Sequence, residues 1–117
     1  MSKVSYVVEF KIKEGGVDGF KQLAAGFISD VKASEMETVG YQWYLAEDGS
    51  RCLIHESFAS SEALLVHLGN VGPDLPKLFE FSEIGRLEVF GPVTDEARGA
   101  LDTLGAQYFP HMGGFDR

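Results

Sequence analysis

The dipeptide Asp48-Gly49 constrains the fold of this chain more than any other feature of its sequence. It separates two runs, residues 41–47 and 50–58, whose composition predicts β-strands. An Asp-Gly pair between strands is typical of a two-residue type I′ turn, in which both central residues adopt positive φ. Because such a turn leaves no room for an intervening helix, the two runs are predicted to pair as an antiparallel hairpin.

The turn also predicts the register of the hairpin, since Glu47 then pairs with Ser50. Successive side chains on a strand point to opposite faces, so each pair counted outward from the turn has an assigned face. The predicted pairs are Trp43 with Ile54 and Tyr41 with Glu56 on one face, and Tyr44 with Leu53 and Gln42 with His55 on the other.

The segments on either side of the hairpin change between the periodicity of strands and that of helices. Ser60 and Thr94 are suited to cap two of these helices, and Gly105 is suited to end the last one. The predicted elements are, in order, a strand at 4–12, a helix from 17 that stops before 40, the hairpin at 41–58, a helix after 60, a short turn around 75–79, a strand at 84–90 and a helix at 94–105.

The order strand, helix, strand, strand, helix, strand predicts a ferredoxin-like α+β fold of βαββαβ type with an antiparallel four-stranded sheet. A length of 117 residues is close to the commonest size of a single domain, so residues 1–117 are predicted to form one domain. Its core is expected at 4–92. Residues 93–117 are expected to be a C-terminal extension, a helix and an aromatic, glycine-rich tail without clear periodicity.

Both faces of this sheet are predicted to carry apolar residues, although helices in this topology cover only one face. Monomers rarely expose a large contiguous apolar patch, so the bare face is predicted to pack against a second copy as a two-fold homodimer. Alternatively, the tail around Tyr108 and Phe109 folds back over that face. The assigned residues are Tyr6, Val8, Phe10, Trp43, Ile54, Phe58 and Phe90 on the helix side, and Val7, Tyr44, Leu53, Leu87 and Val89 on the bare side.

The acidic composition argues against several classes of partner. The chain has 18 acidic and 10 basic residues and a formal net charge of −8, so nucleic acid is not expected to bind. No segment has the character of a membrane span or a signal peptide, and the single Cys52 cannot form an intrachain disulfide. These features predict a cytoplasmic protein without a membrane partner. The histidines lack metal-ligand spacing, so no metal site is expected.

His67 is the most distinctive candidate for chemistry, because it lies on an otherwise apolar stripe of the second predicted helix. Near neutral pH a histidine is suited to accept the proton of a phenol. The structural alternative is a histidine at the edge of the core that is hydrogen-bonded to the backbone.

Glu56 and Arg86 are predicted to lie on the helix-facing side of the sheet, as is Glu88. Charges there are costly unless they are paired or open onto a wet cavity. Glu56 is expected either to orient or deprotonate a substrate or to form a structural pair with Tyr41. Arg86 is expected either to neutralise a phenolate or carboxylate or to form a structural ion pair.

Tyr41 and Trp43 share the same predicted face and are suited to stack on a flat ligand, although aromatic residues of this kind are also common in cores. With Phe10 and Phe58 they predict a pocket in which several polar groups converge. These face assignments assume strands without irregularities, because a β-bulge would exchange the two faces for the residues that follow it.

The run LIHESFASSEALLVHL, residues 53–68, resembles a segment of antibiotic-biosynthesis monooxygenase-like domains. In that family a strand ending in Glu and an aromatic residue leads into a Ser-capped helix that carries Ala-Leu and then His. The element order is similar across about residues 4–92, while only some relatives carry a C-terminal extension. The positions that match are Glu56, Phe58, Ala63, Leu64 and His67.

The resemblance implies a dimeric α/β barrel with a pocket between sheet and helices in each subunit. Catalytic members oxygenate quinols or polycyclic aromatics without metal, flavin or other cofactor, because the deprotonated substrate is electron-rich enough to react with O₂. A cofactor-independent monooxygenase of a small phenolic or quinol-like compound is therefore expected. Its catalytic residues would be His67, Glu56 and Arg86, and its small aromatic ligand would contact Tyr41, Trp43, Phe10 and Phe58.

The alternative is a non-catalytic small-molecule-binding or stress-responsive protein, since related dimeric α/β barrels include such families. Haem-degrading relatives use an Asn on the first strand and a Trp with a His on the second helix. Here the first strand is SYVVEFKI and the second helix offers His67 without Trp, so haem degradation is not expected.

Overall fold

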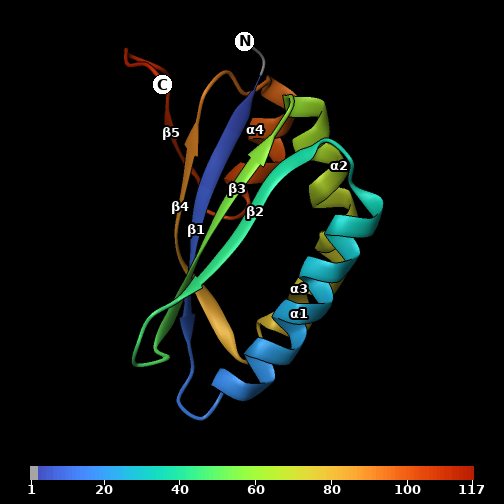
Figure 1. Cartoon of the computed structure of the whole chain (residues 1–117), viewed down its shortest axis with the longest axis vertical. Helices are drawn as coiled ribbons and strands as arrows, with labels where there is room; N and C mark the ends of the chain where they lie inside the picture. The colour runs from blue at the N-terminus through green and yellow to red at the C-terminus, as the bar shows by residue number, and fades with distance from the viewer. Residues whose placement is uncertain (1–2) are drawn as a thin grey trace.

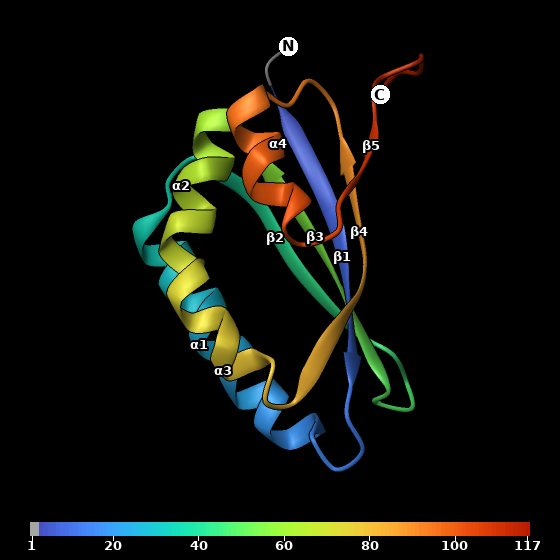
Figure 2. The ribbon, with the colours of Figure 1, turned by 180° about the vertical axis from the view of Figure 1, so that it is seen from behind.

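The computed structural model describes residues 3–117, which form a mixed sheet with helices on one face (Figures 1 and 2). The sheet has five strands in the order β2-β3-β1-β4-β5. The elements are β1 (Val4–Ile12), α1 (Val17–Ser34), β2 (Thr38–Leu45), β3 (Arg51–Phe58), α2 (Ser61–Val71), a 3-10 turn η1 (Gly72–Asp74), α3 (Leu75–Leu78), β4 (Ser82–Phe90), α4 (Asp95–Asp102) and β5 (Gln107–Phe109).

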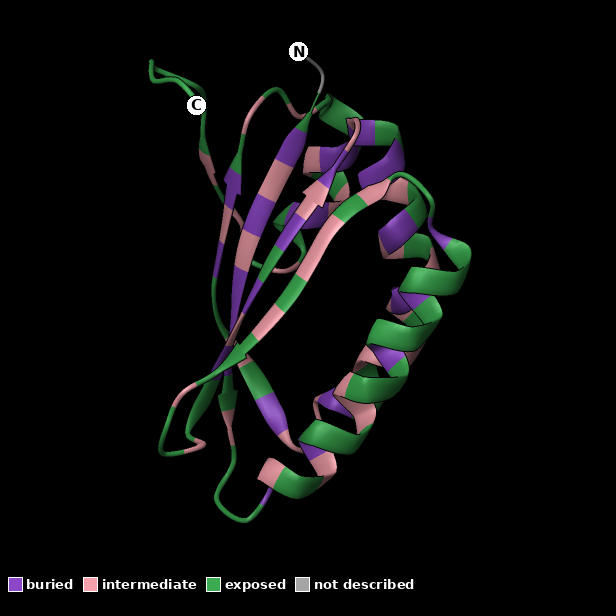
Figure 3. Ribbon diagram, in the orientation of Figure 1, coloured by how far each residue is buried: buried purple, intermediate pink, exposed green. Residues whose placement is uncertain are grey.

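The predicted ferredoxin-like α+β fold is confirmed. Among β1, β2, β3 and β4, each pair of neighbouring strands is antiparallel. The helices lie against one face of the sheet. Buried residues lie where the sheet and the helices face each other (Figure 3), and along β1 and β3 they alternate with less buried residues. The parallel edge strand β5 was not predicted, because three residues are too few to show a periodicity.

The hairpin register is confirmed, but the predicted turn type is wrong. Trp43 lies opposite Ile54, and Tyr41 lies opposite Glu56. In the turn only Gly49 has positive φ, +74°, since no described residue other than glycine does. The Gly49 N–H donates to the Ala46 carbonyl at 2.9 Å, so a four-residue turn closes the same register.

A β-bulge at Gly85 reverses the predicted faces of β4. Phe10 pairs with Ile84 and Glu9 pairs with Arg86, so Gly85 is the extra residue between them. A Cβ at Gly85 would lie 2.2 Å from Oε1 of Glu9, a separation that no real side chain shows. The strand therefore needs glycine at this position as long as Glu9 keeps its place.

As a result, the predicted faces of five β4 residues are wrong. Leu87 and Val89 are buried against the helices, 3% and 1% exposed, although they were expected on the bare face. Phe90 is 38% exposed and stacks on Phe109 of β5, with ring centroids 5.6 Å apart. Glu88 is opposite Val7 of the bare face, and Arg86 lies 3.6 Å from Glu9 on that face.

The bare face of the sheet combines apolar and charged groups. Tyr44 is 56% exposed there, and Val7 and Leu53 are half-buried. Glu9 is buried beneath Arg51, whose Nη1 lies 2.8 Å from its carboxylate. β5 lies beyond β4, away from β2 and β3, so the tail does not fold over Tyr44 or Leu53.

Candidate functional site

His67 is fixed in the interior by the packing of α2. The helix begins after Ser60, whose Oγ accepts a hydrogen bond from the Ala63 N–H at 3.2 Å, as predicted from the capping signal. The His67 side chain is 2% exposed. Its ring packs between those of Phe58 and Tyr41, at centroid distances of 5.2 and 5.4 Å. The helix therefore holds the imidazole in one orientation.

Each ring nitrogen of His67 faces a buried carboxylate. Nδ1 lies 2.7 Å from Oε1 of Glu35, and Nε2 lies 2.9 Å from Oε1 of Glu56. The carboxylates are 3% and 4% exposed. The first contact is a hydrogen bond, whereas Oε1 of Glu56 receives no well-directed hydrogen bond from the described residues. Glu56 therefore keeps acceptor capacity for another group.

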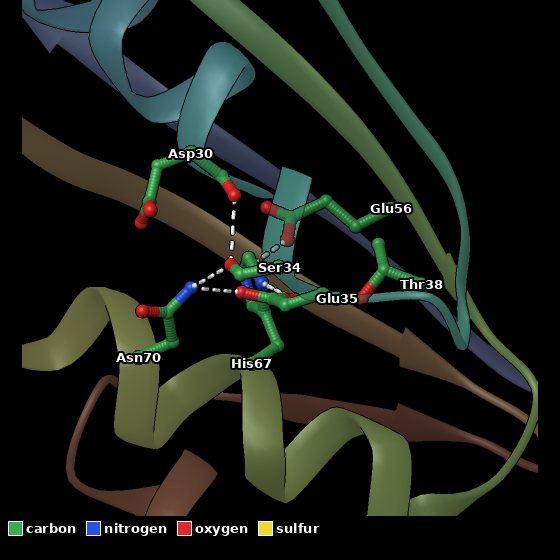
Figure 4. A network of polar contacts seen from close by, with 7 residues as sticks. All are labelled: Asp30, Ser34, Glu35, Thr38, Glu56, His67 and Asn70. Carbon is green, nitrogen blue, oxygen red and sulfur yellow. Dashed lines mark hydrogen bonds and ion pairs between the residues drawn. The ribbon is translucent and has the colours of Figure 1, made fainter. Parts of the chain in front are cut away.

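Glu35 is held on its other sides by neutral donors (Figure 4). It follows the last residue of α1, and its own N–H still donates to the carbonyl of Val31. The Thr38 hydroxyl donates to Oε1 at 2.7 Å, and the Asn70 amide donates to Oε2 at 2.6 Å. Asn70 lies one helical turn beyond His67 on the same side of α2, so one helix supplies two contacts to this carboxylate.

Glu56 lies between two tyrosines on neighbouring strands, since it pairs with Tyr6 of β1 and Tyr41 of β2. Burial raises the pKa of both hydroxyls, and the nearby Glu56 carboxylate raises both further. Both phenols therefore stay protonated at neutral pH. Proton uptake in this part of the site is left to the carboxylates and the imidazole.

The two carboxylates also determine the charge of His67. Burial alone would lower the pKa of the imidazole, but Glu56 and Glu35 outweigh burial and raise it. At Glu35, burial would raise the pKa, while the donors Asn70 and Thr38 and the charge of His67 hold it below the usual value. With both carboxylates ionised and the imidazole protonated, the three groups sum to one net negative charge.

An apolar cavity of about 40 Å³ lies beside Glu56 and His67, between the sheet and the helices. It has room for about two or three water molecules, less than a phenol ring needs. Surface hollows adjoin the cavity at several places: Ile84 and Leu104 also line one of them, and Phe27 and Val71 line another. The lining of the cavity includes Tyr6, Val8, Phe10, Phe27, Tyr41, Trp43, Ile54, Leu68, Val71, Leu75, Leu78 and Leu87.

Trp43 brings an unused donor to this cavity. Its indole Nε1 is buried and has no hydrogen-bond partner among the described residues. A buried polar atom of this kind costs free energy unless a ligand or water pairs with it. The residues that line the cavity thus include Trp43, with an unpaired donor, and Glu56, with an unpaired acceptor.

Most of the predicted site residues lie together, with two exceptions. Phe58 supports the His67 ring and does not line the cavity. The prediction that Arg86 lies on the helix-facing side is wrong, because the Gly85 bulge places it on the opposite face beside Glu9. No group of three or more His, Cys, Asp or Glu side chains within residues 3–117 is arranged to hold a metal ion.

Glu35 was missed by the sequence analysis. The available signal was on α2, where His67 and Asn70 interrupt an apolar surface at i, i+3 spacing and so require polar partners across the interface. That signal predicts a partner but does not identify it, because Glu35 is 32 residues away from His67 along the chain.

The fold and the site together define a ferredoxin-like α+β protein with a buried carboxylate–histidine–carboxylate group beside an apolar cavity. Residues 4–72, more than half of the chain, match the family model described as antibiotic biosynthesis monooxygenase. The chain belongs to this family, as the resemblance of residues 53–68 had indicated. Within residues 3–117, no helix combines the length and apolar character needed to cross a membrane.

Solved structures agree with this assignment. MupZ from Pseudomonas fluorescens is 27% identical and matches with a TM-score of 0.90, covering 100% of this chain and 96% of its own. SnoaB from Streptomyces nogalater, a cofactor-independent oxygenase, is 16% identical with a TM-score of 0.65, covering 76% of this chain and 92% of its own. Rv0793 from Mycobacterium tuberculosis is 19% identical with a TM-score of 0.68, covering 80% of this chain and 98% of its own.

The family includes cofactor-independent oxygenases alongside proteins of unknown function. No curated protein matches the sequence.

Proposed function

We propose that this protein is a cofactor-independent oxygenase of a small, uncharged phenolic or quinol-like compound. The observation that carries the proposal is the buried acid–base group Glu35–His67–Glu56 at the wall of an apolar cavity. A site that has to remove one proton and exclude water needs these two features. Family membership supports the reaction class.

In the proposed reaction Glu56 accepts the proton of the substrate hydroxyl. Glu56 and Glu35 raise the pKa of the adjacent His67 despite its burial, which favours the charged imidazole that would offset the negative charge of Glu56 and of the substrate anion. The electron-rich anion then reduces O₂. One oxygen atom enters the ring and the other leaves as water, so that a hydroquinone yields a hydroxyquinone and the substrate supplies all the electrons. Trp43 Nε1 is free to donate to a substrate oxygen.

The charge of the site limits the substrates it accepts. Arg86 lies on the other face of the sheet, and among residues 3–117 the one basic side chain that lines the cavity, His67, is already paired with two carboxylates. An anionic substrate would bring further negative charge into a buried site that already has an excess of it. The proposed substrates are therefore neutral when they bind and lose a proton only inside.

O₂ uptake tests this proposal directly. An oxygen electrode should show uptake that depends on the enzyme with at least one member of a panel of hydroquinones and dihydroxynaphthalenes. With ¹⁸O₂, one labelled atom should appear in the product. No turnover with any compound, or equal rates in wild type and His67→Ala, would contradict the proposal.

The second candidate is a protein that binds a small molecule without converting it. The size of the cavity limits both candidates equally, because about 40 Å³ does not admit a ring unless the cavity opens. Calorimetry with the same panel separates the two candidates. Saturable binding with no O₂ uptake would support the binding protein, and turnover would exclude it.

We also propose that the bare sheet face mediates a homodimer. Proteins of this family typically dimerise. Such an interface would remove the half-buried Val7 and Leu53 and the exposed Tyr44 from contact with water. Arg51 would keep its ion pair with Glu9. Light scattering at micromolar concentration should therefore give twice the mass of the 12.8 kDa chain. A monomer mass would contradict this arrangement.

A further inference from the structure

Glu35 is the only member of the buried acid–base group that also lies against the outside of the molecule. It lines two surface hollows, one between the end of α1 and the start of α2 and one along β2. His67 and Glu56 line neither hollow and line the interior cavity instead. Tyr41 lines both the second hollow and the cavity. Glu35 therefore links the buried His67–Glu56 pair to the outer hollows.

The hydrogen bonds around Glu35 extend from the cavity to the surface (Figure 4). On the inner side His67 bridges the 2.9 Å and 2.7 Å contacts to Glu56 and Glu35. On the outer side Asn70 donates both to Oε2 of Glu35 and to the exposed hydroxyl of Ser34, at 2.6 and 3.3 Å. Every step of this path is within hydrogen-bond or ion-pair distance.

We propose that Glu35 is the port through which the buried His67–Glu56 pair exchanges its protons with water. In the outward step the Nδ1–H bond of the imidazolium breaks, and the proton forms an O–H bond with Glu35. The acid then releases the proton to water in a surface hollow. The ring is left neutral, with Nε2–H directed at Glu56, and the reverse sequence reloads it. No electrons are transferred in either direction.

This role follows from placement and does not depend on which reaction occurs in the cavity. A carboxylate needed only to pair His67 would work equally well in a sealed position. Here the two donors Asn70 and Thr38 stabilise the ionised form of Glu35, which returns it to the accepting state after each release. The groups facing His67 are Glu35, Glu56 and the hydroxyl-bearing ring of Tyr41, and only Glu35 reaches the hollows as a carboxylate.

Solvent exchange of the imidazole protons tests this role without a substrate. In ¹⁵N-labelled protein at about pH 6, water-saturation transfer measures the exchange rate of the His67 N–H protons. His111 is exposed, so its imidazole protons exchange too fast to interfere, and His55→Gln in every sample removes the signals of His55, which the proposed dimer would cover. In Glu35→Gln the amide still accepts the hydrogen bond but cannot carry the proton. The rate should fall by about 10²-fold, the lower end of the effect of a positioned acid–base group.

Two control variants identify the route. Glu37→Gln removes an exposed carboxylate from one of the same hollows and should leave the rate unchanged. Leu104→Trp adds bulk where the cavity adjoins a different surface hollow and should also leave the exchange rate unchanged. A rate unaffected by Glu35→Gln, or slowed as much by Leu104→Trp, would overturn the proposal.

If Glu35→Gln does not fold, a second variant, Glu35→Ala, still tests the proposal. Glu35→Ala opens a space beside the hollow, and added formate should restore exchange in proportion to its concentration. Exchange that does not respond to formate would overturn the proposal. Because no step uses O₂ or a quinol, failure of the proposed oxygenase function and failure of the proton port give different results.

Discussion

His67→Leu should destabilise the fold by about 3–5 kcal/mol near pH 6, because it leaves two carboxylates buried without their cation. The substitution nearly preserves volume, so lost charge compensation is the main cause of the expected loss. Urea denaturation followed by circular dichroism measures it. His111→Leu, which replaces an exposed histidine of the C-terminal tail, should change the free energy of unfolding by less than about 0.5 kcal/mol.

The pH dependence of the stability loss in His67→Leu shows whether the buried charges cause it. The pKa of His67 is raised above its usual 6.5, so its contribution is complete below that value and is lost as the pH rises through the folded-state pKa. The pKa of Glu35 is lowered below its usual 4.5, so its contribution is present above that value and is lost as the pH falls through the folded-state pKa. Both contributions are complete between 4.5 and 6.5.

The difference between wild type and His67→Leu should therefore be largest in this window and should shrink toward pH 4, where protonation removes the uncompensated charges. Replacing both carboxylates as well, in His67→Leu/Glu35→Gln/Glu56→Gln, should recover part of the loss. A loss below about 1 kcal/mol, or one that does not depend on pH, would show that the buried charges contribute little to stability.

Glu56→Gln should lower kcat by about 10²–10⁴-fold with the substrate identified by O₂ uptake, because the amide cannot accept the substrate proton. The side chain keeps its shape, and His67 keeps the carboxylate of Glu35, so the fold should persist. The limb of the pH–rate profile that reports ionisation of the base should disappear. If Glu56 only positioned the substrate, this limb of the profile would remain in Glu56→Gln.

Glu88→Gln is the matched control for this variant. Glu88 was also expected on the helix-facing side, but the bulge at Gly85 places it opposite Val7 on the bare face. Its substitution should leave kcat within about twofold of wild type, since a surface change far from the site has little effect. Equal losses in the two variants would point to a general effect of charge, and a normal rate in Glu56→Gln would exclude Glu56 as the base.

Local signals predicted the fold well because they act over a few residues. The Asp48-Gly49 pair predicted the hairpin and its register, and the hydroxyls of Ser60 and Thr94 predicted where two helices begin. The predicted conformation of the turn was wrong. Asp48 keeps negative φ while its carboxylate accepts from the Ser50 N–H, so a longer turn reaches the same pairing.

The site was predicted only in part, because its geometry depends on contacts between distant segments. The helical stripe identified His67, and the hairpin register correctly placed Glu56 with Tyr41 and Trp43. Neither periodicity nor spacing indicates that the end of α1 delivers Glu35 to the other ring nitrogen. The assignment of Arg86 was wrong because a single inserted residue reverses every later face of a strand.

The sequence by itself determined the order of strands and helices, the pairing of the hairpin and the family, since turn residues, caps and alternating patterns are local properties of the chain. Only the tertiary structure decided which charges meet. Close packing between α1, α2 and β3 places two carboxylates on one imidazole, and a bulge at Gly85, beside the buried Glu9, shifts the register of β4 by one residue. Such contacts depend on three-dimensional complementarity between segments far apart in the chain, which no local pattern records.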